Sequence, residues 1–198
     1  TTLEVLRQPL EDGHVTISRA LNSTPFPANF VLIASLTPCH CGYRNDPRRD
    51  CHCSVPQIER YMAKISGPLL DRIDLHIEVP PVKFREITSD RTGEPSAQIR
   101  ERVIAARQRQ QQRFKDRPKI TCNARMGTRE LKQYCALDEP TMELLKFAMS
   151  DLNLSARAYD RVLKVARTIA DLAGSEKITG DHVGEAIQFR SLDRQIWA

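Results

Sequence analysis

Residues 155–174 read SARAYDRVLKVARTIADLAG, and this stretch decides how the second half of the chain folds. Ser155 is a residue type that caps helix N-termini, and Gly174 is typical of the position just after a helix ends. Between them, apolar residues recur every three or four positions, as on one helical face. They are Tyr159, Val162, Leu163, Ala166, Ile169, Ala170 and Ala173. We therefore predict one long amphipathic helix that packs against other helices.

Four further helical patterns lie around this stretch. Each begins near a residue type that caps helices, namely Ser96, Thr128, Asp138 and Thr179. We therefore predict that residues 96–198 form a small, all-α helical bundle. The polar residues 86–95 contain Thr92-Gly93-Glu94-Pro95 and are predicted to be the linker that precedes this bundle.

Residues 1–85 carry a mixed pattern instead. Apolar and polar residues alternate over 15–18, which predicts a short half-exposed strand, and the two prolines within 22–29 predict a turn. Residues 30–34 (FVLIA) and 75–79 (LHIEV) are predicted to be strands of a covered, parallel sheet. We therefore predict part of a three-layer α/β domain. Two central strands are too few for such a sheet, so the missing strands are expected upstream of this sequence.

The composition is that of an ordinary globular protein. The chain has 198 residues, with 30 Lys and Arg against 25 Asp and Glu and a formal charge of +5. This charge permits a polyanionic partner without demanding one. Apolar runs stay well below the roughly 18 residues of a membrane span, and the N-terminus does not have the pattern of a signal peptide. We therefore expect a cytoplasmic protein without a membrane partner.

Four of the six cysteines lie within fifteen residues, in Cys39-His40-Cys41 and Cys51-His52-Cys53. In a cytosolic chain, such a cluster favours metal binding or free thiols over disulfides. Cys39, Cys41, Cys51 and Cys53 can hold a structural zinc ion, although C-x-C is tighter than the usual C-x2-C and either histidine could replace a cysteine. The alternative is four free thiols packed in a loop. Ser54 is predicted to cap a helix that ends at Gly67-Pro68.

Two arginines occupy the start of the long predicted helix. Arg157 lies two residues after Ser155, at the positive end of the helix dipole, where a cation is disfavoured unless both face an anion such as phosphate. Arg161 follows one turn later and could share this role. The alternative is that both arginines are solvated surface residues.

Two residues in the first half are also candidates for phosphate chemistry. Arg72 lies between Asp71 and Asp74, where it either forms a local salt bridge or is an arginine finger presented to a neighbour's phosphate. Thr37 follows the predicted strand 30–34 at the end where open α/β sheets bind ligands. Its hydroxyl either orients a water or contacts a phosphate, or simply caps the backbone.

A basic stripe follows the predicted linker. Between Arg100 and Lys119 the helix carries eight cationic residues, among them Arg107, Arg109 and Arg113. This stripe either contacts nucleic-acid phosphates or is a solvated face. Arg19, near the predicted turn, is a further candidate for a DNA contact. The chain contains no G-x-x-x-x-G-K-[ST] phosphate-binding loop of its own.

Three parts of the sequence together resemble a known family. They are residues 3–13 (LEVLRQPLEDG), residues 38–43 (PCHCGY) with 66–75 (SGPLLDRIDL), and residues 154–159 (LSARAY) with 165–172 (VARTIADL). The sequence resembles the magnesium-chelatase-like AAA+ ATPases, and within them the ComM/YifB competence-associated subfamily.

The resemblance implies a fold of class α/β plus all-α. Residues 1–85 would be the C-terminal part of an AAA+ αβα core of the P-loop NTPase type. Residues 96–198 would be the helical lid domain of the magnesium-chelatase C-terminal type. The Walker A lysine and the Walker B acids would precede residue 1, so this fragment alone is not expected to hydrolyse ATP.

The resemblance also implies roles for individual residues. Arg72 would be the arginine finger acting in trans, and Arg157 would be the sensor 2 residue that contacts the γ-phosphate of ATP, with Arg161 beside it. Thr37 occupies the sensor 1 position, where the family usually has asparagine. Residues 15–30 would form the pre-sensor 1 hairpin.

The implied function is that of a hexameric motor which uses ATP and Mg²⁺. Its subfamily resembles DNA helicases that drive branch migration during natural transformation or recombination, so DNA is the expected partner. The first alternative is a chelatase-type ATPase chaperone that remodels a partner protein. The second is a zinc-stapled binding module without an ATPase role.

Overall fold

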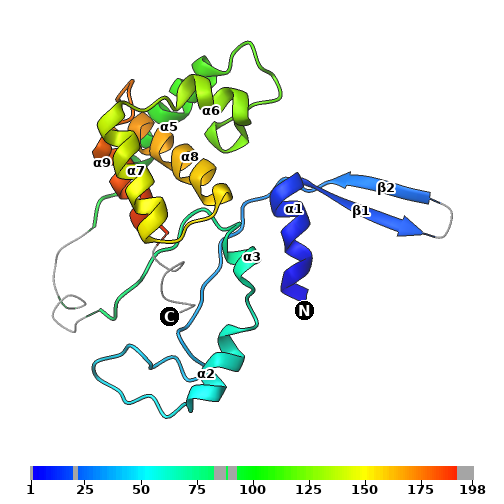
Figure 1. Cartoon of the computed structure of the whole chain (residues 1–198), viewed down its shortest axis with the longest axis vertical. Helices are drawn as coiled ribbons and strands as arrows, with labels where there is room; N and C mark the ends of the chain where they lie inside the picture. The colour runs from blue at the N-terminus through cyan, green and yellow to red at the C-terminus, as the bar shows by residue number, and fades with distance from the viewer. Residues whose placement is uncertain (1, 20–21, 83–87, 89–92, 191–198) are drawn as a thin grey trace. The chain divides into compact units, whose positions relative to one another are not determined.

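The computed structural model of the chain describes residues 2–19, 22–82, 88 and 93–190 (Figure 1). Its contacts divide the chain into two compact units, Thr1–Ile73 and Asp74–Ala198. The linker predicted at 86–95 falls largely outside the described residues, so its position stays a prediction.

The first unit begins with a helical segment that consists of η1 (Thr2–Leu6) and α1 (Arg7–Asp12). The segment ends at Gly13, whose φ of +68° lies in the left-handed region that glycine adopts without strain. The Gly13 N–H donates to the Pro9 carbonyl at 3.0 Å and so closes the last turn.

A two-stranded antiparallel hairpin follows, formed by β1 (His14–Arg19) and β2 (Asn22–Pro27). β1 was predicted, whereas the prediction of a turn over 22–29 is wrong for most of that range. The two prolines of β2 are tolerated because each strand of a two-stranded sheet has a free edge, where a missing N–H donor costs no ladder bond.

The two strands predicted for a parallel sheet are not formed. Residues 30–34 and 75–79 form neither helix nor strand, and the described part of the chain offers them no strand partner. Val31 and Ile33 are 85% and 91% exposed. Apolar side chains make a segment suitable for a buried strand, but only a neighbouring strand supplies the ladder of hydrogen bonds.

Two short helices complete the first unit, α2 (Val55–Met62) and α3 (Gly67–Leu70). Ser54 caps α2 as predicted, but the predicted end at Gly67-Pro68 is wrong, because α2 already ends at Met62. Proline is well suited to the first turn of a helix, and the Ser66 side chain accepts from the Leu69 N–H at 3.2 Å. Gly67-Pro68 therefore begins a helix instead of ending one.

The second unit is helical, as predicted. Its elements are α5 (Ser96–Arg113), η2 (Asn123–Arg125), α6 (Thr128–Tyr134), α7 (Glu139–Asp151), α8 (Ala156–Leu172) and α9 (Gly180–Gln188). Asp138, Ser155 and Thr179 are N-caps as predicted. The caps of α5 and α6 are instead Pro95 and Gly127, one residue before the predicted ones.

α8 lies among the other helices of this unit (Figure 1) and contacts α5, η2, α6 and α9. Its apolar face belongs to one continuous core, in which Leu145, Val162, Ala166 and Val183 are almost fully buried. Each large aliphatic side chain buried here contributes roughly 1.5–3 kcal/mol. That these helices have the arrangement of an AAA+ lid stays a prediction. Within the described residues, no helix is both long enough and apolar enough to cross a membrane.

Candidate functional site

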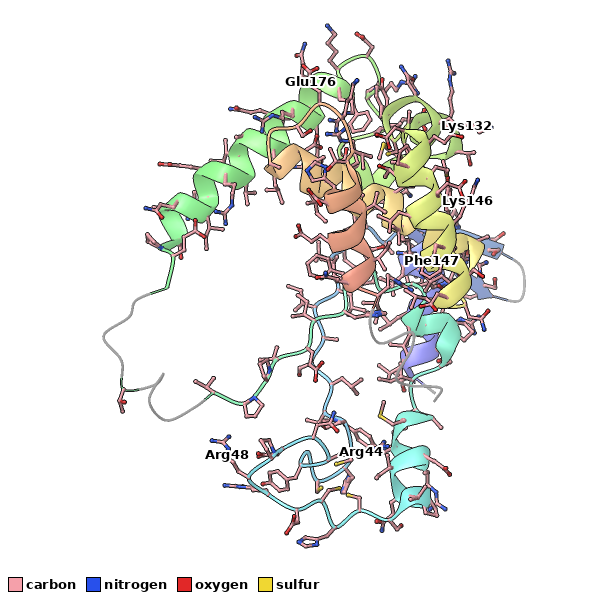
Figure 2. All side chains as sticks on the ribbon, turned by 60° about the vertical axis from the view of Figure 1, so that its left-hand side comes forward. Arg44, Arg48, Lys132, Lys146, Phe147 and Glu176 are labelled. Atoms are coloured by element: carbon pink, nitrogen blue, oxygen red, sulfur yellow. The ribbon has the colours of Figure 1, made fainter. Side chains whose placement is uncertain are left out.

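The four clustered cysteines meet in the loop 38–53. The sulfur atoms of Cys39, Cys41, Cys51 and Cys53 all lie within 4.8 Å of one another and could hold a metal ion. The Sγ atoms of Cys39 and Cys41 are 3.3 Å apart, and the Sγ atom of Cys51 lies 3.7 Å from the first and 3.6 Å from the second. Figure 2 shows the sulfur atoms inside this loop, with Arg48 on its outer side. The spacing in the sequence thus predicted residues that the fold brings together.

Hydrogen bonds distribute charge unevenly over these thiols. Burial tends to raise the pKa of Cys39, but hydrogen bonds from the Cys41 thiol and from the Arg44 N–H lower it to about 6. The Cys53 N–H tends to lower the pKa of Cys51, but burial and hydrogen bonds to the Cys41 and Cys39 thiols raise it to about 12. The pKa is thus lowered at Cys39 and raised at Cys51, in opposite directions within one cluster.

The two histidines of the cluster lie outside this group. The His40 ring packs edge-on against the Tyr61 ring, with centroids 6.2 Å apart, and His52 is exposed. Within the described residues, the group of potential ligands contains the four cysteines alone. The alternative in which a histidine replaces a cysteine is therefore not supported by this arrangement.

Thr37 connects the extended segment to the cysteine loop and to α2. Its hydroxyl donates to the Cys39 carbonyl at 3.1 Å and shares a hydrogen bond of 2.8 Å with the Tyr61 hydroxyl. Tyr61 was not predicted as a partner of Thr37, because two residues 24 positions apart in the sequence carry no local signal of pairing. The Thr37 hydroxyl is thus engaged in structural contacts.

Arg72 is buried, with 8% of its surface exposed. Its guanidinium forms an ion pair with Glu11 and donates to the Pro68 carbonyl at 2.6 Å. The carboxylates next to Arg72 were the predicted partners, whereas Glu11 lies 61 residues away and was not predicted. A pairing at that distance along the chain has no local signature.

The N-terminal part of α8 carries cations of the second unit. Arg157 is exposed in the first turn, which the Ser155 side chain caps by accepting from the Ala158 N–H at 3.1 Å. Arg161 forms an ion pair with Asp74. Burial and the nearby Arg161 guanidinium lower the pKa of Lys164. Arg157 therefore places a positive charge at the N-terminal turn of a long helix.

Part of the basic stripe on α5 is engaged within the helical unit. Arg113 binds both carboxylate oxygens of Asp171, at 2.8 and 2.5 Å. Arg109 donates to the Asp171 carbonyl at 2.9 Å. Arg107, in contrast, is exposed and donates to a neighbouring glutamine at 3.3 Å, and Arg19 is exposed on β1.

Asp171 is a fully buried carboxylate that the sequence analysis did not single out. Arg167 lies 3.2 Å from it in addition to Arg113, and the Asn123 amide donates to it at 2.8 Å. Burial tends to raise the pKa of Asp171, but these bonds, chiefly that from Arg113, lower it. The spacing of four residues between Arg167 and Asp171 is the signal that could have identified the pair.

The two parts of the chain match two models of one protein family. Residues 1–87 match magnesium chelatase, subunit ChlI, and residues 93–190 match the ChlI C-terminal model. The two models thus meet near the predicted linker.

Curated relatives agree with this match. The chain is 43% identical over 194 residues to the competence protein ComM of Haemophilus influenzae, covering 97% of this chain and 36% of that protein. It is 40% identical over 195 residues to the uncharacterized protein YifB of Escherichia coli, covering 98% of this chain and 37% of that protein. The chain spans little more than a third of the length of these relatives. With both halves matched in order, the chain belongs to the magnesium chelatase-like family.

Proposed function

We propose that this chain is part of an ATP-driven AAA+ motor in which Arg157 contacts the γ-phosphate of ATP. The observation that supports this is that Arg157 is an exposed residue in the first turn of α8, in a chain of this family. Helix N-termini attract anions through their free N–H groups and their dipole, and a guanidinium binds phosphate oxygens in a two-pronged geometry. Together they would stabilise the charge of the transferred phosphoryl group.

Arg72 is proposed as the finger that reaches ATP bound to a neighbouring subunit. In this structure Glu11 neutralises its guanidinium. Reaching a neighbour would require Arg72 to exchange Glu11 for a phosphate, so that its charge stays paired in both states. A finger that acts in trans implies a ring of identical subunits, which we propose to be a hexamer.

The remaining ATPase machinery would lie in the part of the relatives that this chain does not cover. That part would supply the phosphate-binding loop and the ligands of Mg²⁺, because the 198 residues contain no G-x-x-x-x-G-K-[ST] sequence. Thr37, at the sensor 1 position, would contribute its hydroxyl only if it gave up its bond to Tyr61. Such a motor would act in the cytoplasm.

DNA is the proposed substrate, and the protein would be a helicase or branch-migration factor. The net charge is +5, and the exposed Arg19 lies at the end of β1, beside the hairpin tip. Arg107 on α5 is a second proposed phosphate contact. Arg109 and Arg113 would hold α5 in place through Asp171. The name of the relative from Haemophilus influenzae, a competence protein, is consistent with this substrate.

The experiment that tests the motor is ATP turnover by the full-length protein, with and without branched DNA. Arg72→Ala and Arg157→Ala are each expected to lower turnover by at least about 10³-fold, as removal of an arginine finger does. Arg60→Ala and Arg129→Ala, which change exposed arginines of the same two units, serve as matched controls. Turnover that is unchanged in Arg157→Ala would contradict its proposed role.

The DNA contact is tested by the salt dependence of forked-DNA binding. Arg19→Ala is expected to reduce the slope of log affinity against log salt by about 1, which corresponds to one lost phosphate contact. Arg129→Ala should leave the slope unchanged. Binding that is absent or insensitive to salt would remove DNA as the substrate.

A second candidate function follows from the names of the matched models. Both models are described as magnesium chelatase, subunit ChlI. This description favours an ATPase that remodels a partner protein. In that case ATP turnover would not respond to branched DNA, and Arg19→Ala would have no effect on it. A zinc-stapled module without an ATPase role would instead leave full-length turnover absent.

A further inference from the structure

The cysteine loop is a feature that the proposed motor does not use. It spans residues 38–53 and contains no regular helix or strand. Charged and polar residues predominate in it, and Cys39 is its buried apolar residue. Ordering a loop of this length costs conformational entropy, and so little apolar burial offers little to offset that cost. The convergence of four thiols therefore requires another source of stability.

We infer that Cys39, Cys41, Cys51 and Cys53 form a structural zinc site that fastens this loop in front of α2. A zinc ion with four sulfur ligands at about 2.3 Å in a tetrahedron places the sulfur atoms about 3.8 Å from one another. The measured separations of 3.3, 3.6 and 3.7 Å, with all four sulfurs within 4.8 Å, are close to that geometry.

The set of ligands indicates both the metal and its role. Four thiol groups are soft ligands, which favour zinc over magnesium or calcium. All four tetrahedral positions would be filled by protein atoms, which leaves none for water or substrate, as in structural sites. The site is therefore distinct from the Mg²⁺ that accompanies ATP in the proposed motor.

The backbone of the loop turns sharply between the first two cysteines of the cluster. The Gly42 N–H donates to the Cys39 carbonyl at 3.1 Å and so closes the turn that carries Cys39 and Cys41. A closed turn of this kind fixes the direction of both thiols toward the other two cysteines. Gly42 has a φ of +83°, so the turn after Cys41 uses a conformation that favours glycine.

The site would connect the loop to the rest of the first unit. The Cys39 carbonyl accepts from Thr37, whose hydroxyl also bonds to Tyr61 on α2. The last ligand, Cys53, directly precedes the Ser54 cap of that helix. At the outer side of the loop, Arg49 donates to the Tyr43 hydroxyl at 2.8 Å. Zinc would thus hold both ends of the loop and leave its basic outer side exposed.

A disulfide within the cluster and a bound iron ion can both be distinguished from bound zinc. A disulfide requires a sulfur–sulfur distance of about 2.04 Å, whereas all six cysteines of the structure are free. Iron can also bind four cysteines, so the identity of the metal must be measured directly.

The test is metal analysis of the full chain, purified under reducing conditions without a metal-affinity column. We expect one zinc per chain after dialysis, by elemental analysis. In the folded, zinc-bound chain the four cluster thiols should not react with a chromogenic disulfide reagent, whereas all six thiols should react once the chain is denatured in the presence of a zinc chelator. Cobalt(II) substitution should give the absorption spectrum of a tetrahedral thiolate site.

Single-cysteine variants test which thiols bind the zinc ion. Cys39→Ser and Cys53→Ser should each reduce bound zinc at least tenfold under competition with a chelator, whereas Cys122→Ser, at a cysteine outside the cluster, should retain it. Far-ultraviolet circular dichroism shows whether each variant is folded, and the wild-type competition stands even if Cys39→Ser does not fold. Six reactive thiols with no metal, a disulfide within the cluster, iron in place of zinc, or zinc retained by Cys39→Ser would each overturn the proposal.

Discussion

The two units of this chain differ in what holds them together. In the second unit, α6 to α9 share one continuous apolar core, and the long helix α8 lies in it and also contacts α5. In the first unit the apolar segment 30–34 is exposed, and the local anchors are polar, namely the Arg72–Glu11 ion pair and the cysteine cluster. A helix forms its own backbone hydrogen bonds and needs only a surface to pack on, whereas a strand also needs a neighbouring backbone. Apolar sequence alone therefore produced structure in one unit and not in the other.

The largest expected effect is at Asp171, the buried charge of the helical unit. Asp171→Ala leaves the guanidinium groups of Arg113 and Arg167 without their carboxylate partner. Breaking a buried ion pair in this way costs about 3–5 kcal/mol. Chemical denaturation of the wild type and the variant measures it. Glu143→Ala, which breaks an exposed ion pair with Lys146, is the control and should cost at most about 1 kcal/mol.

The dependence of folding stability on pH provides a second test of the role of Asp171. The pKa of Asp171 is lower in the folded than in the unfolded chain, so its ion pairs stabilise the fold above the unfolded pKa of about 3.9. That contribution is lost as the pH falls further, through the folded pKa. Asp171→Asn should therefore be less stable than the wild type at neutral pH, and the difference should shrink below about pH 4. A difference that stays constant with pH would contradict this account.

The apolar residues offer a direct comparison of the two units. Leu145→Ala removes a fully buried side chain of the helical core and should cost about 2–5 kcal/mol. Val31→Ala removes an exposed side chain of the first unit and should change stability by at most about 0.5 kcal/mol. Thermal unfolding of both variants tests the contrast. Equal losses would show that residues 30–34 are buried in solution.

Metal removal should affect only the first unit. The loop carries Arg44, Arg48 and Arg49 as exposed trypsin sites. Adding a chelator should increase cleavage there at least about tenfold, which corresponds to 1.4 kcal/mol of lost local stability. Cleavage within α8, and the thermal unfolding of the helical unit, should not change. Unchanged cleavage of the loop would indicate that it is ordered without metal.

A small loss of stability is expected at the cap of α8. Ser155→Ala removes the side-chain acceptor for the Ala158 N–H and should cost about 1 kcal/mol. Ser155→Gly, which fits a cap position, should cost only a few tenths of that. Equilibrium unfolding of the two variants provides the measurement. A larger loss in the glycine variant would contradict capping as the cause.

The sequence predicted what depends on near neighbours. Helix formation, the Ser155 and Asp138 caps and the end of α8 before Gly174, with its φ of +73°, rest on residues within one or two turns. The cysteine cluster could also be predicted from the sequence, because both C-x-C pairs lie within one short loop. The family was recognised from short stretches for the same reason.

The tertiary structure alone decided the contacts between residues far apart in the sequence. Arg72 forms an ion pair with Glu11, which is distant in the sequence. Asp171 of α8 forms an ion pair with Arg113 of α5 and so connects the two helices. Residues 22–27 pair as a strand despite their prolines, while 30–34, with a stronger strand pattern, do not. A local sequence pattern indicates which secondary structure a segment can form. Whether it forms depends on which distant backbone or charge the folded chain brings within hydrogen-bonding distance, and no local pattern contains that information.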